Sequence, residues 1–320
     1  HGLFGGIYLT HLRSALYKHI AVYEDIICAE KKPKKPEIIK GDFRNEGREQ
    51  IFLRNQSCSV IINPAFGATI SEFTNRKKRT NVFDTIARRK EAYHSILQNI
   101  SDDDSNNTNV QSIHEMVTVK EKGLQKYLVY DSSRRYSCKD LLFTSLPQPD
   151  DLMFNRIDYV DCSLHPFSFV MKDTTIQCDS LSDSLPAISK IFSIHATDPI
   201  LTVHYDIEGY SGLLGLEFTI NMLVPHSKEC YYGIEGVASE ESYLDSMGTS
   251  SGITQVTMVD TIRDVSFSIK TSKPFILLRY PVYTVSQSDS GFEKNYQGSC
   301  MVLCFEMNNS LHLDCKLTIQ

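Results

Sequence analysis

Ten short runs rich in β-branched and aromatic residues dominate the chain from residue 59 to its end. In order they are SVIINP, KYLVYD, FSFVMK, ILTVHYDIEG, LEFTINMLVP, ITQVTMVD, VSFSIK, FILLRYPVYTV, CMVLCFEM and LHLDCKLTI. Apolar and polar residues alternate in several of them, and clusters of Gly, Pro, Asp or Ser separate them, as between antiparallel strands. No helical periodicity intervenes at the spacing of βαβ units. The sequence therefore predicts a mostly β fold, a large antiparallel β-sandwich or barrel.

The start of the chain has a different pattern. Between residues 7 and 30 apolar side chains recur at helical spacing, which predicts one helix of about 20 residues. These side chains are Ile7, Leu9, Leu12, Leu16, Ile20, Ile26 and Ile27. The run KKPKKP at 31–36 ends the helix, because proline cannot continue its hydrogen bonds and like charges prefer solvent. We expect a helical segment and linker at residues 1–36 and one β-sandwich domain at residues 37–320.

Composition and charge exclude several classes of partner. A net charge of −6 over 320 residues argues against nucleic-acid binding, which needs clustered Lys and Arg. No apolar stretch reaches the ~18 residues of a membrane span. The nine cysteines are odd in number and scattered, which favours reduced core thiols in a cytoplasmic protein. Cys300 and Cys304 would share one strand face without a second pair at zinc-ligand spacing, so we expect core packing, no metal and no cofactor.

Two polar stretches are candidates for surface function. NVFDTIARRKEAYHSILQN, residues 81–99, contains Asp84, Arg88, Arg89 and His94, groups that bind polyols through bidentate hydrogen bonds. Spacing alone favours an ordinary solvated segment with internal ion pairs. The run SDDDSNNTN, residues 101–109, lacks the glycine and glutamate of a calcium loop and is expected to be a surface loop.

A third stretch, residues 286–300, is polar and contains Asp289 and Glu293, and we expect it to form a long loop between two strands. A binding edge at the end of the sandwich and a plain connection are equally good interpretations. A single polar cluster in a sandwich cleft or between domains is possible, made of Asp84, Arg88, Arg89, His94, Glu217 and Glu293. Paired with His204 or His165, Glu217 would suit an aldose epimerase, but only strand placement supports that pairing.

The chain opens with HGLFGGIYLTHLRSALYKHI, a histidine and glycine-rich turn that feeds the predicted helix. There is no initiator Met and no signal-peptide pattern, and a turn of this kind usually lines a site. We expect this opening to be a cut through a larger protein.

Four stretches together resemble the C-terminal half of glycoside hydrolase family 57 enzymes of the 4-α-glucanotransferase and α-amylase type. They are HGLFGGIYLTHLR, INPAFGATISEFTNRKKRTNVFDTIARRKEAYH, SIHEMVTVKEKGLQKYLVYDSSRRYS and YPVYTVSQSDSGFEKNYQGS, and they lie in the family's order. The resemblance implies a β-sandwich of the galactose-mutarotase-like kind that follows a catalytic barrel and a helical segment. The family's catalytic glutamate and aspartate lie on that barrel, so no catalytic residue is expected in this chain.

The resemblance also implies a role for the opening. His1, Gly2, Gly5 and Gly6 match a stretch that lies beside the active-site cleft, so they would contact or approach the glucan. The chain has no Trp, so sugar stacking from this half would use Tyr or Phe.

The resemblance implies the non-catalytic C-terminal portion of a retaining α-1,4-glucan enzyme, with a 4-α-glucanotransferase favoured over an α-amylase. The alternative is a stand-alone carbohydrate-binding or scaffold module. The expected partners are an α-glucan or maltooligosaccharide and the N-terminal barrel, and a homodimer is left open.

Overall fold

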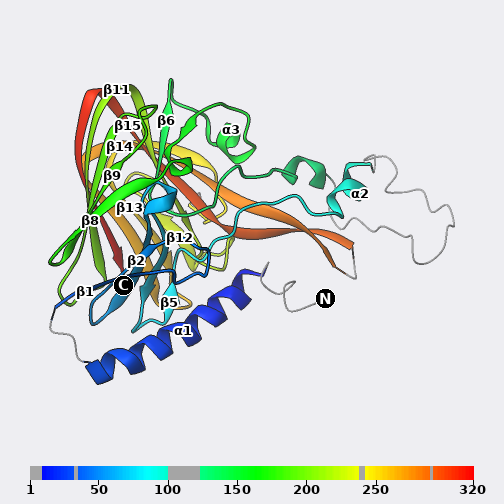
Figure 1. The fold of residues 1–320 in the computed structure, drawn as a ribbon. Coiled ribbons are helices and arrows are strands. Elements are labelled where there is room, and N and C mark those ends of the chain that lie inside the picture. Colours follow the sequence, from blue (N-terminus) through cyan, green and yellow to red (C-terminus); the bar gives the residue numbers. More distant parts are fainter. Residues whose placement is uncertain (1–8, 32–34, 100–122, 238–241, 289–290) are drawn as a thin grey trace.

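The computed structural model describes residues 9–31, 35–99, 123–237, 242–288 and 291–320. Two antiparallel sheets form its body, and one long helix, α1 (Thr10–Lys31), runs along the lower edge as drawn (Figure 1). The smaller sheet contains, in chain order, β1 (Glu37–Gly41), β2 (Gln50–Arg54), β3 (Cys58–Asn63), β4 (Thr69–Asn75) and β5 (Thr80–Asn81). The predicted mostly β fold, antiparallel and preceded by a helix, is confirmed.

The larger sheet has ten strands, eight of them on one continuous path. Its order is β12 (Cys230–Gly233), β13 (Gly248–Asp260), β14 (Val265–Ser288), β15 (Gly291–Ile319), β11 (Ile200–Ile220), β10 (Ala187–Ile194), β9 (Thr175–Ser180) and β8 (Phe167–Lys172), and β6 (Lys139–Phe143) and β7 (Val160–Asp161) branch from β11. Short helices in the connections are η2 (Pro64–Phe66), α2 (His94–Gln98), η4 (Leu124–Tyr127), α3 (Pro149–Met153) and η5 (Cys162–Leu164).

The larger sheet is buried on both faces where β11, β14 and β15 run together. Along β15, Met301 and Leu303 pack in the core between the two sheets. Cys300 and Cys304 point the other way, into a second core that includes Met153 of α3. Burial on both faces explains why CMVLCFEM is apolar at nearly every position. The expected placement of the two cysteines on one strand face, as core residues, is confirmed.

Strand β11 changes the face that it buries at a one-residue bulge. Odd-numbered residues such as Val203 enter the core before the bulge, and even-numbered ones such as Leu214 enter it afterwards. The register against β15 shifts between Glu208 and Tyr210, which leaves Gly209 as the extra residue. Side chains alternate with a period of two, so one inserted residue reverses the buried face. Gly209 has a φ of +85°, a conformation that glycine adopts without strain.

Helix α1 packs on the sandwich through its polar residues. The Arg13 guanidinium donates to the main-chain oxygen of Asp84 at 2.8 Å and to the side chain of Gln297 at 2.8 Å. Ser59 of β3 donates to the Glu24 carboxylate at 2.7 Å. These bonds join the helix to three separate parts of the sandwich. Because hydrogen bonds are directional, they fix both the position and the orientation of the helix.

The apolar stripe of α1 faces away from the sandwich. Its side chains are 37% to 66% exposed, and they are Leu9, Leu12, Leu16, Ile20, Tyr23 and Ile26. The predicted helix is confirmed, but its apolar stripe does not enter the core of the described chain, and among its apolar side chains Ala21 is buried. Each such side chain left in water forgoes about 1.5–3 kcal/mol of burial free energy.

The prediction of a polar loop at 286–300 is wrong for residues 286–288 and 291–300, which belong to two paired strands. Asp289 lies outside the described residues. Ser286 of β14 lies opposite Glu293 of β15. Val285 and Phe292 are buried in a small third core with Leu97 of α2, which holds the strands together. A polar stretch can form a ladder when its few apolar residues are buried and its backbone groups pair.

Asp84 gives α1 packing a testable pH dependence. Burial raises the pKa of Asp84 to about 7, against the opposing charge of Arg13. The native state therefore binds this proton more tightly than the unfolded chain, and stability falls as pH rises through the interval from about 4 to about 7.

We predict that Asp84→Asn removes this dependence. The wild type should lose roughly 2 kcal/mol of unfolding free energy, relative to Asp84→Asn, between pH 5 and pH 8. Urea unfolding at the two pH values measures this, and parallel pH profiles for the two proteins would contradict it.

Candidate functional site

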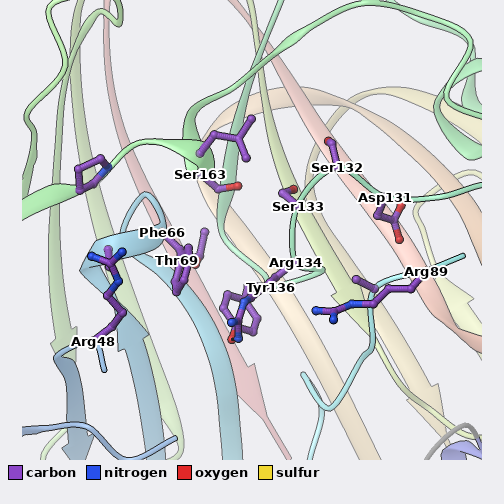
Figure 2. Close-up of a pocket in the computed structure, with 14 residues that line it drawn as sticks. Arg48, Phe66, Thr69, Arg89, Asp131, Ser132, Ser133, Arg134, Tyr136 and Ser163 are labelled. Atoms are coloured by element: carbon purple, nitrogen blue, oxygen red, sulfur yellow. Dashed lines mark hydrogen bonds between the residues drawn. The ribbon is translucent and has the colours of Figure 1, made fainter. Parts of the chain in front are cut away.

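A pocket of about 540 Å³ opens between the end of the small sheet, η5 and the segment 131–136 that leads into β6 (Figure 2). Its lining combines arginines, hydroxyl groups and aromatic rings: Arg48, Ala65, Phe66, Thr69, Ala87, Arg89, Asp131, Ser132, Ser133, Arg134, Tyr136, Ser163, Leu164 and Pro166. This size suits a small polar ligand.

The floor of the pocket depends on Gly67, the residue after η2. Gly67 has a φ of +66°, and a Cβ there would lie 2.7 Å from the Cα of Ser163. Its N–H donates to the main-chain oxygen of His165 at 3.0 Å. Because only glycine permits this approach, η2 and η5 can meet and place Phe66 and Ser163 on adjoining walls.

One carboxylate clamps the two irregular segments beside the pocket. Asp131 accepts hydrogen bonds from the main-chain N–H of Arg88 and from its guanidinium, both at 2.7 Å. It also accepts two bonds from Arg135, at 2.9 and 2.8 Å. Burial would raise the pKa of Asp131, but the charges of Arg135 and Arg88 outweigh it and hold the pKa well below its ordinary value. Arg88 also donates to the main-chain oxygen of Met153 at 2.8 Å, which ties the clamp to α3.

A second set of buried ion pairs, centred on Lys139, lies beneath the pocket. The Lys139 ammonium lies 2.9 Å from Asp161 and 3.6 Å from Glu217. Burial would lower the pKa of Lys139, but the charges of Glu217 and Asp161 outweigh it and raise the pKa. Asp161 accepts the hydroxyl hydrogens of Ser133 and Ser163, each at 2.6 Å. Of the three serines that line the pocket, Ser133 and Ser163 therefore have hydroxyl groups oriented by the ion pairs beneath them.

One wall of the pocket consists of the rings of Phe66 and Tyr136 with the Arg134 guanidinium beside them. The guanidinium lies 4.9 Å from the ring centre of Phe66 and 5.6 Å from that of Tyr136. It also pairs with Glu46 and donates to the Tyr136 hydroxyl at 2.8 Å. These contacts neutralise Arg134 and cover both rings, so the wall is rigid and polar.

Arg48 and Arg89 enter the pocket from opposite sides, with Arg134 and Tyr136 between them in Figure 2. Both are exposed, and neither makes an ion pair or a side-chain hydrogen bond within the described residues. The Thr69 hydroxyl is buried without a hydrogen-bond partner there. The arrangement suits binding, because the carboxylate and serines that a catalytic couple would need are already committed to other groups.

The other predicted site residues lie in separate surroundings. Asp84 holds α1, Arg88 belongs to the clamp and Glu217 contacts Lys139. His94 Nε2 faces the Val285 main-chain oxygen at 3.0 Å, and the ring stacks on Tyr130.

Of the polar residues predicted at 81–99, only Arg89 lines this pocket. Glu293 lies in the hairpin of β14 and β15. His1, Gly2, Gly5 and Gly6, with the run 101–109, lie outside the described residues.

The epimerase pairing of Glu217 with His204 is wrong. His204 pairs with Asp314 at 2.8 Å on an exposed sheet face, and Glu217 is buried beside Lys139 and Tyr280. His204 and Glu217 are 13 residues apart (217 − 204) on the same strand, β11, and this separation corresponds to roughly 40 Å.

Sequence reasoning missed most of the pocket and its support. Arg48, Thr69, Asp131 and Lys139 come from four separate parts of the chain, and their proximity depends on tertiary structure. The run SSRRYSCKD, residues 132–140, carries the only local signal, because charged residues inside a strand-like pattern must find buried partners.

The described residues contain no group of three or more His, Cys, Asp or Glu side chains that could hold a metal ion. None of the described helices is both long and apolar enough to cross a bilayer.

Comparison with known proteins identifies relatives along the whole chain. The profile of the family described as alpha-amylase/4-alpha-glucanotransferase, C-terminal, matches residues 42–319. The chain is 29% identical to alpha-amylase 1 of Dictyoglomus thermophilum, across 96% of this chain and 44% of that protein. It is 27% identical to the 4-alpha-glucanotransferase of Thermococcus kodakarensis, across 97% and 44%. The chain thus spans less than half the length of these curated relatives.

A solved structure shows the same fold. The 4-alpha-glucanotransferase of Thermococcus litoralis superposes with a TM-score of 0.72 at 20% identity, across 99% of this chain and 44% of that one.

Removing the charge of Asp131 should destabilise the fold far more than removing the charge of the exposed Asp150. Asp131→Asn should lower the free energy of unfolding by about 3–5 kcal/mol, because it leaves two buried guanidiniums without a countercharge. The control Asp150→Asn removes a pair with Arg156 whose side chains are 43% and 54% exposed, and it should cost less than about 1 kcal/mol. Urea unfolding compares them, and equal losses would contradict the assignment.

Proposed function

We propose, because this chain belongs to the alpha-amylase/4-alpha-glucanotransferase C-terminal family, that it is the non-catalytic part of a retaining enzyme acting on α-1,4-glucans. A 4-α-glucanotransferase is favoured over an α-amylase. In such an enzyme a carboxylate forms a glycosyl-enzyme, which a glucan hydroxyl or water then discharges. We assign both catalytic carboxylates to an N-terminal domain that this chain does not include.

The single observation that carries this proposal is the family match over residues 42–319. The state of the buried carboxylates supports it. Asp131 is paired with two arginines, and Asp161 and Glu217 flank Lys139. Their lone pairs serve the fold, so these groups are unsuited to nucleophilic attack or proton transfer.

We further propose that the apolar stripe of α1 docks on that N-terminal domain. The stripe follows one side of the helix for its whole described length, and the helix lies at the N-terminal end of this chain. A contiguous exposed apolar face marks an interface. A homodimer through the same face is the competing arrangement, and sedimentation of the natural gene product distinguishes the two by mass.

A stand-alone carbohydrate-binding module is the second candidate. The pocket favours it, because guanidiniums and hydroxyl groups converge there without help from another domain. We place either form in the cytoplasm, supported by eight cysteines of the described chain that are buried and unpaired.

Assays on maltoheptaose separate these functions. We predict that the natural gene product carrying this chain converts maltoheptaose into shorter and longer maltooligosaccharides, and that the 320-residue chain alone does not. Products no longer than maltoheptaose would indicate an α-amylase. Turnover by the chain alone, or an inert gene product, would contradict the proposal.

If α1 docks on the N-terminal domain, charges placed on its apolar stripe should weaken the contact between the two halves of the gene product. Leu16→Glu combined with Ile20→Glu should speed proteolytic cleavage between the two halves and lower transfer activity at least about tenfold, because two charges enter an apolar interface. The control Lys18→Glu changes the net charge by the same amount at an exposed position off the stripe. Equal effects of the two variants would contradict the docking.

A further inference from the structure

The pocket carries positive charge that the chain does not neutralise. Arg134 pairs with Glu46, and Asp131 pairs with both Arg88 and Arg135. Arg48 and Arg89 remain without an acidic partner among the described residues. The chain as a whole is acidic, with a net charge of −6, so two unpaired guanidiniums facing one cavity are a local exception. Guanidinium groups bind the oxygens of carboxylates and phosphates through paired hydrogen bonds, and two guanidinium charges match those of a phosphate dianion.

Two serine hydroxyl groups of the pocket, those of Ser133 and Ser163, need a ligand that donates hydrogen bonds. Ser163 and Ser133 both give their hydrogens to Asp161, and Ser133 also accepts from Lys139 at 2.8 Å. Their free lone pairs can therefore only accept hydrogen bonds from a ligand. The dianion of a phosphate monoester has no hydrogen on its phosphate oxygens to donate, whereas a sugar has several hydroxyl hydrogens. Thr69 adds a buried hydroxyl that has no partner of its own in the described chain.

We propose that this pocket binds a sugar that carries a phosphate group. Arg48 and Arg89 would approach the phosphate from opposite sides of the pocket, and Ser133, Ser163 and Thr69 would hold the sugar hydroxyls. The cavity of about 540 Å³ is large enough for one or two sugar units with a phosphate. The phosphate part rests on the pocket alone, and the sugar part also rests on the proposed function. The source can be a free hexose phosphate or a phosphorylated position on a glucan chain.

Calorimetric titration of the 320-residue chain tests this directly. The probes are glucose 6-phosphate, maltotriose phosphorylated on one O6, unmodified maltotriose and inorganic phosphate. We expect either phosphorylated sugar to bind at least about tenfold more tightly than maltotriose or phosphate, with an affinity that falls as salt rises. The tighter of the two phosphorylated probes identifies the source.

Matched variants locate the site. Arg89→Gln and Arg48→Gln should each weaken binding of the phosphorylated sugar by about tenfold or more, since each removes one charge-assisted contact. Lys90→Gln removes the same charge from the exposed neighbour that does not line the pocket, and it should leave affinity within about twofold. Unchanged thermal unfolding midpoints check that these exposed positions leave the fold intact.

Three outcomes overturn the inference. Equal affinity for maltotriose and its phosphorylated form would make the pocket a neutral sugar site. Inorganic phosphate binding as tightly as the sugar phosphates would remove the sugar part. Equal losses in Arg89→Gln and Lys90→Gln would move the site elsewhere. The maltoheptaose assay is separate, so failure of the proposed function would appear there and not in these titrations.

Discussion

The clamp of Asp131 between Arg88 and Arg135 is the interaction on which the rest of this structure depends. Residues 84–91 and 131–136 contain almost no regular secondary structure, yet they pass beside the second core and form one side of the pocket. Their backbones meet directly, because the N–H of Asp131 donates to the oxygen of Arg88 at 2.9 Å. A carboxylate with two bidentate partners replaces the ladder of hydrogen bonds that a strand would otherwise supply.

Helix α1 inverts the usual relation between amphipathicity and burial. Its inner face uses Arg13 and Glu24 to contact polar groups of the sandwich, and its outer face presents Leu12, Leu16 and Ile20 to solvent. A helix with this arrangement is stable in a larger assembly that covers its apolar stripe. The same helix links our proposal about the whole enzyme to a surface that can be altered without touching the pocket.

The spacing of apolar residues along the sequence correctly predicted several strands of the sandwich. Alternation in VSFSIK and LHLDCKL identified strands, and the uninterrupted apolar run around Cys300 and Cys304 marked a strand buried on both sides. The sequence could not reveal which face of α1 would be buried, because an apolar stripe ordinarily packs inward. It also could not reveal the hairpin at 286–300, where polar residues are carried by buried Val285 and Phe292.

The pocket was least predictable, for a physical reason. Buried charges need partners that are close in space, and the partners of Asp131 and Lys139 come from distant segments. Of the residues singled out in advance, Arg89 lines the pocket, and Arg88 and Glu217 support it from below. The grouping of Asp84, His94 and Glu293 with them as one cluster is not what the fold produces.

Amide hydrogen exchange at Arg88 and Asp131 tests most directly whether the clamp makes the pocket wall a fixed frame. Both amides lie outside the regular strands, and both are hydrogen-bonded across the clamp. Our account predicts that they exchange as slowly as the amide of Leu214 in β11, through global unfolding alone. Exchange within seconds to minutes, as for an ordinary loop, would show that the wall opens independently and would contradict the account.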